Sequence, residues 1–169
     1  MLAAQTASPI RRLVLNDVGP FIPAAALERI AGYLGADPTF LAEDALEIYL
    51  RHIHAPFGPL TDAQWRHLAQ HSARRRDDGM MGLAYDPGIA AVFTMGEIDD
   101  VDLWSLWDSV TCPVLVIRGE SSDLLTPEVA GQMVERGHNV RLVEIAGCGH
   151  APALMDDGQI AIVRDWLNA

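Results

Sequence analysis

The sequence predicts an α/β fold in which a parallel sheet is flanked by helices and interrupted by a helical insertion. Three short apolar runs, at residues 12–17, 113–118 and 140–145, each end at a turn. Continuous apolar strands of this kind are typical of parallel sheets that are covered on both faces. A well-marked helix separates the second and third runs, whereas residues 20–109 contain helical patterns and no convincing strand.

The first strand, Arg12–Asp17, ends at Val18-Gly19-Pro20, and the insertion follows. Asp37-Pro38 opens one predicted helix and Thr61-Asp62 opens another. An insertion of this length between consecutive parallel strands is more than a crossover needs. We therefore expect residues 20–109 to form a helical cap or lid over the carboxyl ends of the strands. The apolar positions at helical spacing are Leu41, Ala45, Leu46, Ile48 and Tyr49 in the first helix, and Trp65 and Leu68 in the second.

The second half of the chain predicts a β-α-β unit. Strand Pro113–Arg118 is followed by a helix with Thr126 as its N-cap, Pro127 at its first position and Gly137 as its end. Strand Val140–Ile145 comes next, and a last helix runs from about residue 157 to 167. Residues 1–19 and 110–169 are thus expected to form the sheet-bearing core.

Charge and composition exclude several classes of partner. The formal net charge is -11, which argues against sequence-independent nucleic-acid binding and against an anionic membrane surface, because both need clustered cations. All 12 basic residues are Arg, so Schiff-base chemistry and a phosphate-binding lysine are excluded. A small-molecule or protein partner is the expectation that remains.

Cysteine usage and hydropathy predict a cytoplasmic chain without a metal or cofactor. Cys112 and Cys148 form no metal-ligand spacing and no disulfide framework. His67 and His71 have the spacing of a metal pair, but no third ligand is evident, so we interpret them as a polar helix face. The sequence contains no apolar run long enough to span a membrane and no recognisable leader.

Two polar loops that follow strands are the candidate site. Ser122-Asp123 follows the strand that ends at Arg118, and Gly147-Cys148-Gly149-His150 follows the next strand. Ligands of open parallel sheets bind at the carboxyl ends of the strands. An imidazole beside a carboxylate is the arrangement that activates a nucleophilic hydroxyl, because the carboxylate orients the ring and stabilises its charged form. We therefore predict Asp123 as the acid and His150 as the general base.

The same segments resemble the C-terminal portion of the α/β-hydrolases, the superfamily of esterases, lipases, epoxide hydrolases and carbon-carbon bond hydrolases. This resemblance implies a partial α/β-hydrolase fold and an ester-like or apolar carbonyl compound as the small-molecule substrate. Family order is nucleophile, acid, histidine, and it implies Asp123 and His150 in the last two roles. The matching residues are Cys112–Gly119, Ser122-Asp123 with Thr126-Pro127, Gly147–Pro152, and the lead-in at Asp102–Trp104.

The departure from the family is at the start of the chain. No Gly-x-Ser-x-Gly occurs in the sequence, and by the family pattern this nucleophile turn would lie about a dozen residues before Met1. The oxyanion-hole donors would lie upstream as well. We therefore expect the chain alone to be inactive, as a truncated hydrolase that would use a Ser or Asp nucleophile when complete.

Other residues near these loops have alternative interpretations. Asp17 also follows a strand and is a second candidate for the acid, although we favour a role in the turn before Gly19. Cys148, two residues before His150, is a conceivable replacement nucleophile, but we favour a small structural thiol. Ser121 and Ser122 are interpreted as hydrogen-bonding to the loop of Asp123. Five apolar side chains either line a substrate pocket or pack the cap: Trp65, Met80, Met81, Phe93 and Met95.

A second hypothesis is a non-catalytic binding or dimerisation module, either a truncated paralogue or a subunit. Strand Arg12–Asp17 would lack its family neighbour in this chain, and a bare strand edge tends to pair with another chain. This predicts a homodimer through the exposed sheet edge. Retention of both Asp123 and His150 favours the hydrolase over this module.

Overall fold

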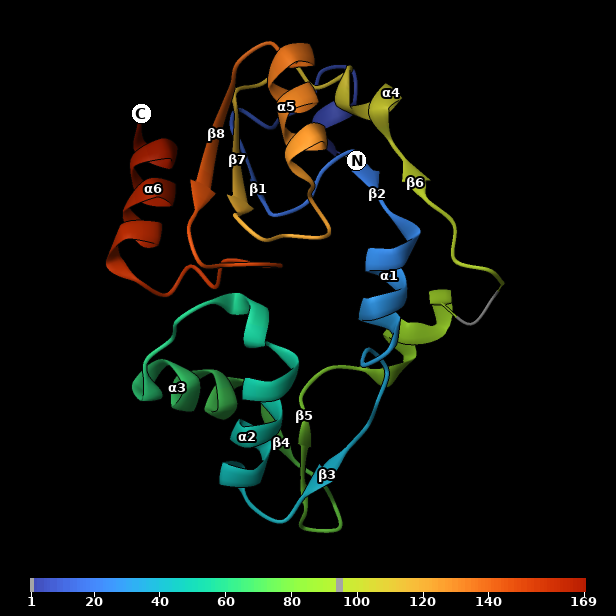
Figure 1. Cartoon of the computed structure of the whole chain (residues 1–169), viewed down its shortest axis with the longest axis vertical. Coiled ribbons are helices and arrows are strands. Elements are labelled where there is room, and N and C mark those ends of the chain that lie inside the picture. The colour runs from blue at the N-terminus through green and yellow to red at the C-terminus, as the bar shows by residue number, and fades with distance from the viewer. Residues whose placement is uncertain (1, 94–95) are drawn as a thin grey trace. The chain divides into compact units, whose positions relative to one another are not determined.

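The computed structural model describes residues 2–93 and 96–169, and the chain divides into two compact units (Figure 1). The first unit comprises Met1–Ala26, Pro56–Gly58 and Asp99–Ala169, and the second comprises Leu27–Ala55 and Pro59–Ile98. The predicted cap of residues 20–109 thus has different bounds from the second unit. The difference lies at residues 20–26, 56–58 and 99–109, which belong to the first unit.

The first unit contains a three-stranded parallel sheet in the order β1-β7-β8. Its strands are β1 (Leu13–Asn16), β7 (Val114–Gly119) and β8 (Val140–Ile145). The register pairs Leu13 with Val114 and Val114 with Val140. All three strands were predicted from their apolar runs, and the α/β class with a parallel sheet is confirmed. The central strand β7 is buried along its whole length.

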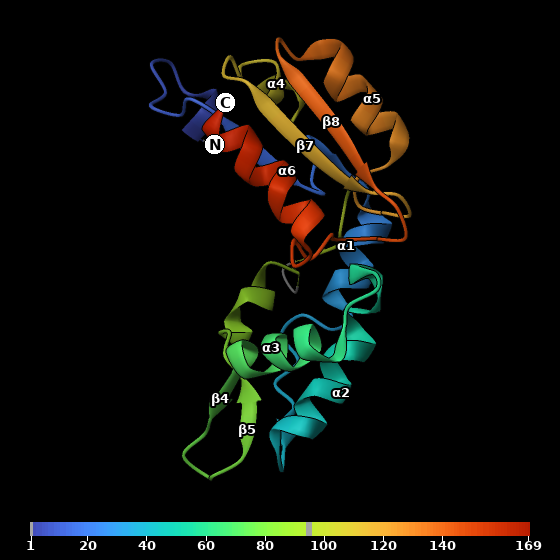
Figure 2. The ribbon, with the colours of Figure 1, turned by 90° about the vertical axis from the view of Figure 1, so that its left-hand side faces the viewer.

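Helices cover both faces of this sheet (Figure 2). On one face, Val114 and Val116 of β7 pack against Met133 of α5 (Pro127–Arg136) and Trp107 of α4 (Trp104–Trp107). On the other face, Leu115 and Ile117 pack against Trp166 of α6 (Asp157–Asn168). The alternation follows from the strand itself, because successive side chains point to opposite faces.

The predicted helix boundaries in this unit are confirmed. Thr126 caps α5 by accepting a hydrogen bond from the backbone N–H of Val129, and Pro127 occupies the first turn. Asp156 caps α6 in the same way through the N–H of Gln159. These side chains satisfy donors that a helix N-terminus leaves unpaired.

Two short strands lie where the chain leaves the sheet and where it returns. Strand β2 (Phe21–Ile22) pairs antiparallel with β6 (Val101–Asp102). Helix α1 (Ala24–Ala31) follows β2, and the side chain of Asp100 accepts a hydrogen bond from the N–H of Ala24. A short 3-10 helix (Leu2–Ala4) precedes β1, and Ala3 packs in the same core as Trp107.

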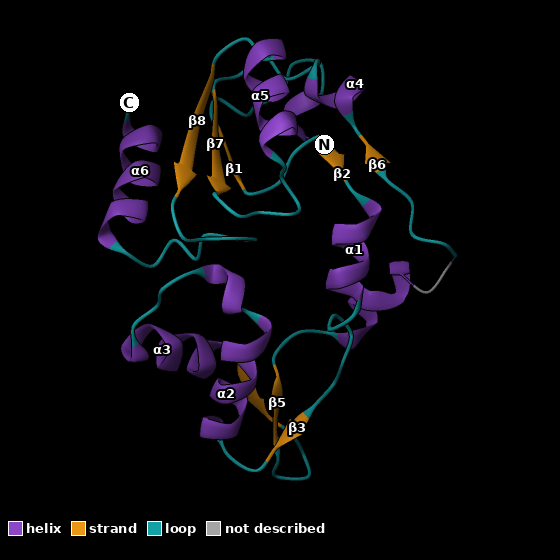
Figure 3. Ribbon diagram, viewed as in Figure 1, coloured by secondary structure: helices purple, strands orange, loops and turns teal. Residues whose placement is uncertain are grey.

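The second unit contains helices α2 and α3, most of α1, and a small antiparallel sheet (Figure 3). Helix α2 (Glu43–Ile53) and helix α3 (Asp62–Ser72) pack around a core of Leu46, Leu50, Trp65, Ala69 and Leu83. The sheet has the order β3-β5-β4. The bounds are Thr39–Phe40 for β3, Ala73–Arg75 for β4 and Met81–Leu83 for β5, and a 3-10 helix occupies Pro87–Phe93. Another 3-10 helix, Ala55–Phe57, lies mostly in the first unit.

The expectation of no strand in residues 20–109 was therefore wrong. The strands there have two or three residues each, which is too short for a periodic pattern to show in the sequence. Asp77-Asp78-Gly79 forms the turn of the β4–β5 hairpin, and Gly79 adopts φ +83°. Acidic residues followed by Gly between two chain segments are a hairpin signal.

The first predicted cap helix begins later than expected. Asp37-Pro38 does not open it, because β3 comes first and α2 starts at Glu43. Asp37 instead forms an ion pair, at 2.7 Å, with Arg76, which directly follows β4. Thr61, by contrast, caps α3 as predicted, and Gln64 completes a reciprocal capping box. No helix of the described residues has the length and apolar character needed to cross a bilayer.

Leu115→Ala is expected to lower the free energy of unfolding by about 3 kcal/mol, because a fully buried side chain between sheet and α6 is lost and a cavity remains. Ile160→Ala is the control, since Ile160 is largely exposed on α6 and its loss should cost less than about 1 kcal/mol. Urea unfolding followed by tryptophan fluorescence measures both. Equal losses in the two variants would contradict the assigned core.

Candidate active site

Asp17 lies directly after β1 and turns its carboxylate into the protein. Its side chain is 0% exposed. Its backbone adopts φ +57°, and its N–H donates a 2.7 Å hydrogen bond to the carbonyl of Ile117 on β7. The left-handed conformation is uncommon for residues other than glycine, and Asp tolerates it better than most. The turn role foreseen for Asp17 is thus present, but it brings the carboxylate inward.

His150 lies in the loop after β8, and its ring reaches the Asp17 carboxylate. Nδ1 is 2.8 Å from Oδ2 of Asp17 and 3.1 Å from the carbonyl oxygen of Asp17. A carboxylate and a carbonyl only accept hydrogen bonds, so Nδ1 carries the hydrogen. In the neutral ring Nε2 is then the acceptor. The His150 side chain is 23% exposed, so unlike the Asp17 carboxylate it is in part accessible to solvent.

Two further groups donate to the same carboxylate. The backbone N–H of Gly119 donates to Oδ1 at 2.7 Å, and the hydroxyl of Ser122 donates to Oδ2 at 2.6 Å. With the His150 ring, three donors surround a carboxylate that has no access to solvent. Burying a charge without such partners is strongly unfavourable. The site therefore consists of the buried Asp17 carboxylate and the His150 imidazole that is hydrogen-bonded to it.

Asp123, the predicted acid, lies one residue beyond Ser122 in the loop after β7 and has an exposed side chain. The position of the acid on Nδ1 of His150 is occupied by Asp17. The assignment of Asp123 to this role stays a prediction. His150 is placed as predicted, at the carboxyl end of the sheet.

Asp17 was named in the sequence only as the second candidate. The signal that could have favoured it was its place at the end of a strand that neighbours β7, because carboxyl ends of parallel strands meet at one sheet edge. The sequence around Asp17 does not indicate whether its side chain points into the protein or into solvent. Its left-handed backbone decides the direction, and that is not visible in the residue pattern.

The segment Pro56–Gly58 holds the loop that carries His150. The N–H of Gly149 donates to the carbonyl of Pro56 at 2.7 Å, and the thiol of Cys148 donates to the carbonyl of Phe57 at 3.3 Å. Burial raises the pKa of the Cys148 thiol, with smaller contributions from the negative charges of Asp156 and Asp17. The thiol therefore stays protonated at neutral pH, which supports its interpretation as a structural residue.

Arg118 fixes the loop between β7 and α5. Its Nε donates to the carbonyl of Leu125 at 2.8 Å, and its Nη2 donates to the carbonyl of Glu120 at 3.0 Å. Its Nη1 pairs with Glu144 on the neighbouring strand β8. The buried guanidinium thus ties both ends of the loop that contains Ser122. Arg is suited to this role because its planar group presents several fixed donors.

The model of the alpha/beta hydrolase family matches residues 1–162. The chain belongs to this family. It is 41% identical to the 3-hydroxybutyrate-oligomer hydrolase of Cupriavidus necator over 175 residues, which cover 99% of the chain and 60% of that relative. This chain of the α/β-hydrolase family thus spans 60% of the length of the curated relative that it matches.

Solved structures agree with the family. An α/β-hydrolase from Novosphingobium aromaticivorans is 36% identical, with a TM-score of 0.85, and the match covers 99% of this chain and 60% of that one. A protein from Rickettsia typhi that is described as a hydrolase is 32% identical, with a TM-score of 0.89, and the match covers 99% and 56%. The fold assigned from the sequence is therefore that of this family.

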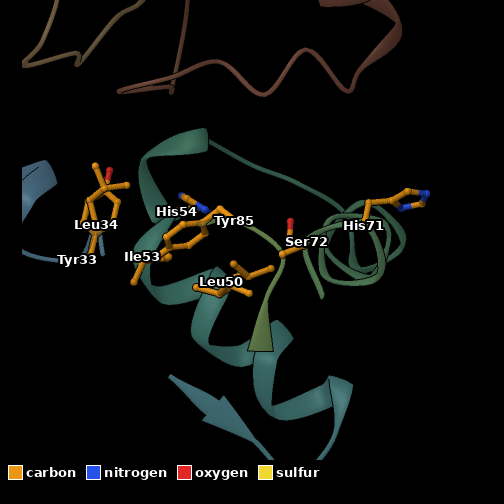
Figure 4. A pocket seen from close by; sticks show the side chains of 10 residues that line it. Tyr33, Leu34, Leu50, Ile53, His54, His71, Ser72 and Tyr85 are labelled. Atoms are coloured by element: carbon orange, nitrogen blue, oxygen red, sulfur yellow. The ribbon is translucent and has the colours of Figure 1, made fainter. Parts of the chain in front are cut away.

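The second unit of this α/β-hydrolase chain contains a pocket of about 360 Å³ (Figure 4). Leu50, Ile53 and Leu83 give it an apolar wall, and His54 and Ser72 add polar groups. Burial lowers the pKa of His54, so its ring is neutral at neutral pH. The pocket therefore suits an uncharged, mainly apolar ligand.

Two of the five apolar side chains left open between pocket lining and packing of the cap are placed by the structure. Trp65 and Met81 pack in the core of the second unit, and the pocket is lined by other residues. Met95 lies outside the described residues. Among the described residues, no group of three His, Cys, Asp or Glu is arranged to hold a metal ion. His71 contacts the carbonyl of His67 through Nδ1 at 2.8 Å, as neighbours on one helix do.

Gly119→Ala is expected to disrupt the site, because a Cβ there would lie 2.2 Å from the carbonyl oxygen of Gly149 and 2.8 Å from that of Cys148. Backbone on both sides would have to move, and we expect a loss of about 2–3 kcal/mol in the free energy of unfolding. Gly131→Ala on α5 is the control, since its Cβ would meet no atom within 4 Å.

The control should raise the free energy of unfolding by about 0.5–1 kcal/mol, because Ala favours the helix over Gly. Chemical denaturation of both variants provides the comparison. If Gly119→Ala were as stable as the parent chain, the close approach of the loops after β7 and β8 would be incorrect.

Proposed function

We propose that this chain provides the general base and the acid of an α/β-hydrolase that cleaves ester-like bonds, with His150 as base and Asp17 as acid. The observation that carries the proposal is the 2.8 Å contact between Nδ1 of His150 and a carboxylate of 0% exposure. A buried carboxylate on Nδ1 fixes the ring and stabilises the imidazolium that forms during reaction.

The proposed chemistry proceeds in two steps. Nε2 of His150 removes the proton of a nucleophilic hydroxyl as that oxygen attacks the substrate carbonyl, and the ring then gives the proton to the departing alcohol. In the second step the ring removes a proton from water, which attacks the acyl group and releases the acid. No Gly-x-Ser-x-Gly occurs in the 169 residues, so the proposed nucleophile comes from outside this sequence.

The proposed substrates are esters of short hydroxy acids. This class is supported by the 41% identity to a 3-hydroxybutyrate-oligomer hydrolase, since such oligomers are joined by ester bonds. We further propose that the second unit is the cap and that its pocket accepts part of the substrate. Its apolar wall and its neutral His54 suit an uncharged acyl chain. Cleavage of a carbon-carbon bond beside a carbonyl is the alternative reaction of the same base and acid.

A chimera tests the proposal: this chain replaces the part of the C. necator relative that it matches, and hydrolysis of 3-hydroxybutyrate oligomers is measured. Turnover is expected in the chimera, and the 169-residue chain alone is expected to show none above background. His150→Ala and Asp17→Asn should each lower kcat/KM by roughly 10³-fold or more, as removal of a triad member does.

Asp123→Asn is the matched control and should lower kcat/KM by less than about tenfold, because its exposed side chain is not the carboxylate on Nδ1. The opposite ranking of Asp17→Asn and Asp123→Asn would transfer the acid role to Asp123. Turnover by the chain alone that disappears in His150→Ala would show that the nucleophile lies within the 169 residues.

A second candidate function is a pairing module that uses the edge of β1. Among the described residues, β1 pairs only with β7. The N–H groups of Leu13 and Asp17 donate toward β7, so those of Val14 and Asn16, on the alternate positions, face the other edge. An open strand edge of this kind is a template for another strand. We propose that it pairs with a second copy when no other strand occupies it.

Light scattering tests this pairing, and a dimer is expected for the parent chain. Val14→Pro should give a monomer, because Pro removes one outward N–H while the ladder to β7 stays intact. Val14→Ala keeps that N–H and should remain a dimer. A monodisperse monomer in the parent chain would exclude the pairing module.

A further inference from the structure

We propose that Ser122 is a positioning residue, whose hydroxyl fixes the Asp17 carboxylate in the orientation that His150 requires. The inference rests on the proposed function, in which Asp17 is the acid. Ser122 is buried and lies in the loop after β7. Its hydroxyl bonds to Asp17 and to two backbone N–H groups of its own loop, so its effect on His150 would act through Asp17.

The surrounding groups decide where the Ser122 hydrogen points. Its Oγ accepts hydrogen bonds from the N–H of Leu124 at 3.2 Å and from the N–H of Leu125 at 3.1 Å. A hydroxyl has one hydrogen and two lone pairs. Both lone pairs are therefore occupied, and the hydrogen is directed to Oδ2 of Asp17, 2.6 Å away.

This directed hydrogen bond holds the plane of the carboxylate. Gly119 fixes Oδ1 from the backbone of β7, and Ser122 fixes Oδ2 from the loop that follows it. A carboxylate held at both oxygens cannot rotate about its last bond. Oδ2 consequently stays in line with Nδ1 of His150, which is the oxygen that the ring uses.

The loop gives Ser122 little freedom to turn away. Leu125, whose N–H donates to the Ser122 hydroxyl, has its carbonyl bound by the buried Arg118. The neighbouring Ser121 has a different partner, since its hydroxyl donates to the carbonyl of Cys148 at 3.0 Å. The two adjacent serines thus form a useful comparison: Ser121 is exposed and contacts the loop of His150, whereas Ser122 is buried and contacts the Asp17 carboxylate.

The test follows the Nδ1 proton of His150 by NMR in the 169-residue chain labelled with ¹⁵N-histidine. His150→Ala identifies the signal among the six histidines, and Asp17→Asn is expected to abolish its protection from exchange with water. Ser122→Ala should speed that exchange by roughly tenfold, which corresponds to the loss of one net hydrogen bond. Ser121→Ala is the control: it removes one hydrogen bond to the loop of His150 and none to Asp17, so it should speed the exchange less than Ser122→Ala does.

The exchange rates in these variants distinguish the role of Ser122 from the role of Asp17. Unchanged exchange in Ser122→Ala, with a response to Asp17→Asn, overturns the role of Ser122 and leaves the proposed acid intact. No response to Asp17→Asn overturns the acid itself. If Ser122→Ala does not fold, Ser122→Cys takes its place: it keeps the side-chain shape but weakens the donor, so faster exchange supports the proposal and exchange at the parent rate overturns it.

Discussion

A carboxylate with no access to water determines how the site is built. Asp17 has three donors around it, from the loop of His150, from the backbone of β7 and from the side chain of Ser122. Each donor comes from a different segment, so the charge can be buried only when β1, β7 and the loop after β8 are all in place. The cost of an unpaired buried charge therefore links the folding of the sheet to the assembly of the Asp17–His150 pair.

The strand order β1-β7-β8 brings these groups together. All three strands run in the same direction, so their carboxyl ends open at one edge, where Asp17 and His150 meet across β7. Helices on both faces bury the central strand and leave this edge to loops. The result is a rigid platform with polar side chains at its end, the usual place for ligands in parallel sheets.

The sequence allowed the sheet and its flanking helices to be predicted, because apolar strands and the capped helix at Thr126 are local signals. His150 was also placed correctly, by its position after a strand. The carboxylate beside His150 was harder to predict, because Asp17 and Asp123 both follow strands and the inward turn of Asp17 depends on a backbone angle. The strands of the second unit were missed because two or three residues carry no period, and the pairing of β3 with β5 joins segments distant in sequence.

The small segment Pro56–Gly58 belongs to the first unit although its neighbours on both sides belong to the second. The second unit is consequently formed by two chain segments, Leu27–Ala55 and Pro59–Ile98, and each segment is joined at both ends to residues of the first unit. In the segment Pro56–Gly58 the backbone carbonyls of Pro56 and Phe57 accept the hydrogen bonds from the His150 loop, so these bonds do not depend on the side chains at positions 56 and 57. Gly58 is different, because its φ is +90° and a Cβ would lie 2.5 Å from the sulfur of Cys148. Related sequences can therefore vary in the length of either segment of the second unit and in the residue types at positions 56 and 57. A glycine at position 58 is needed for the close approach to the His150 loop.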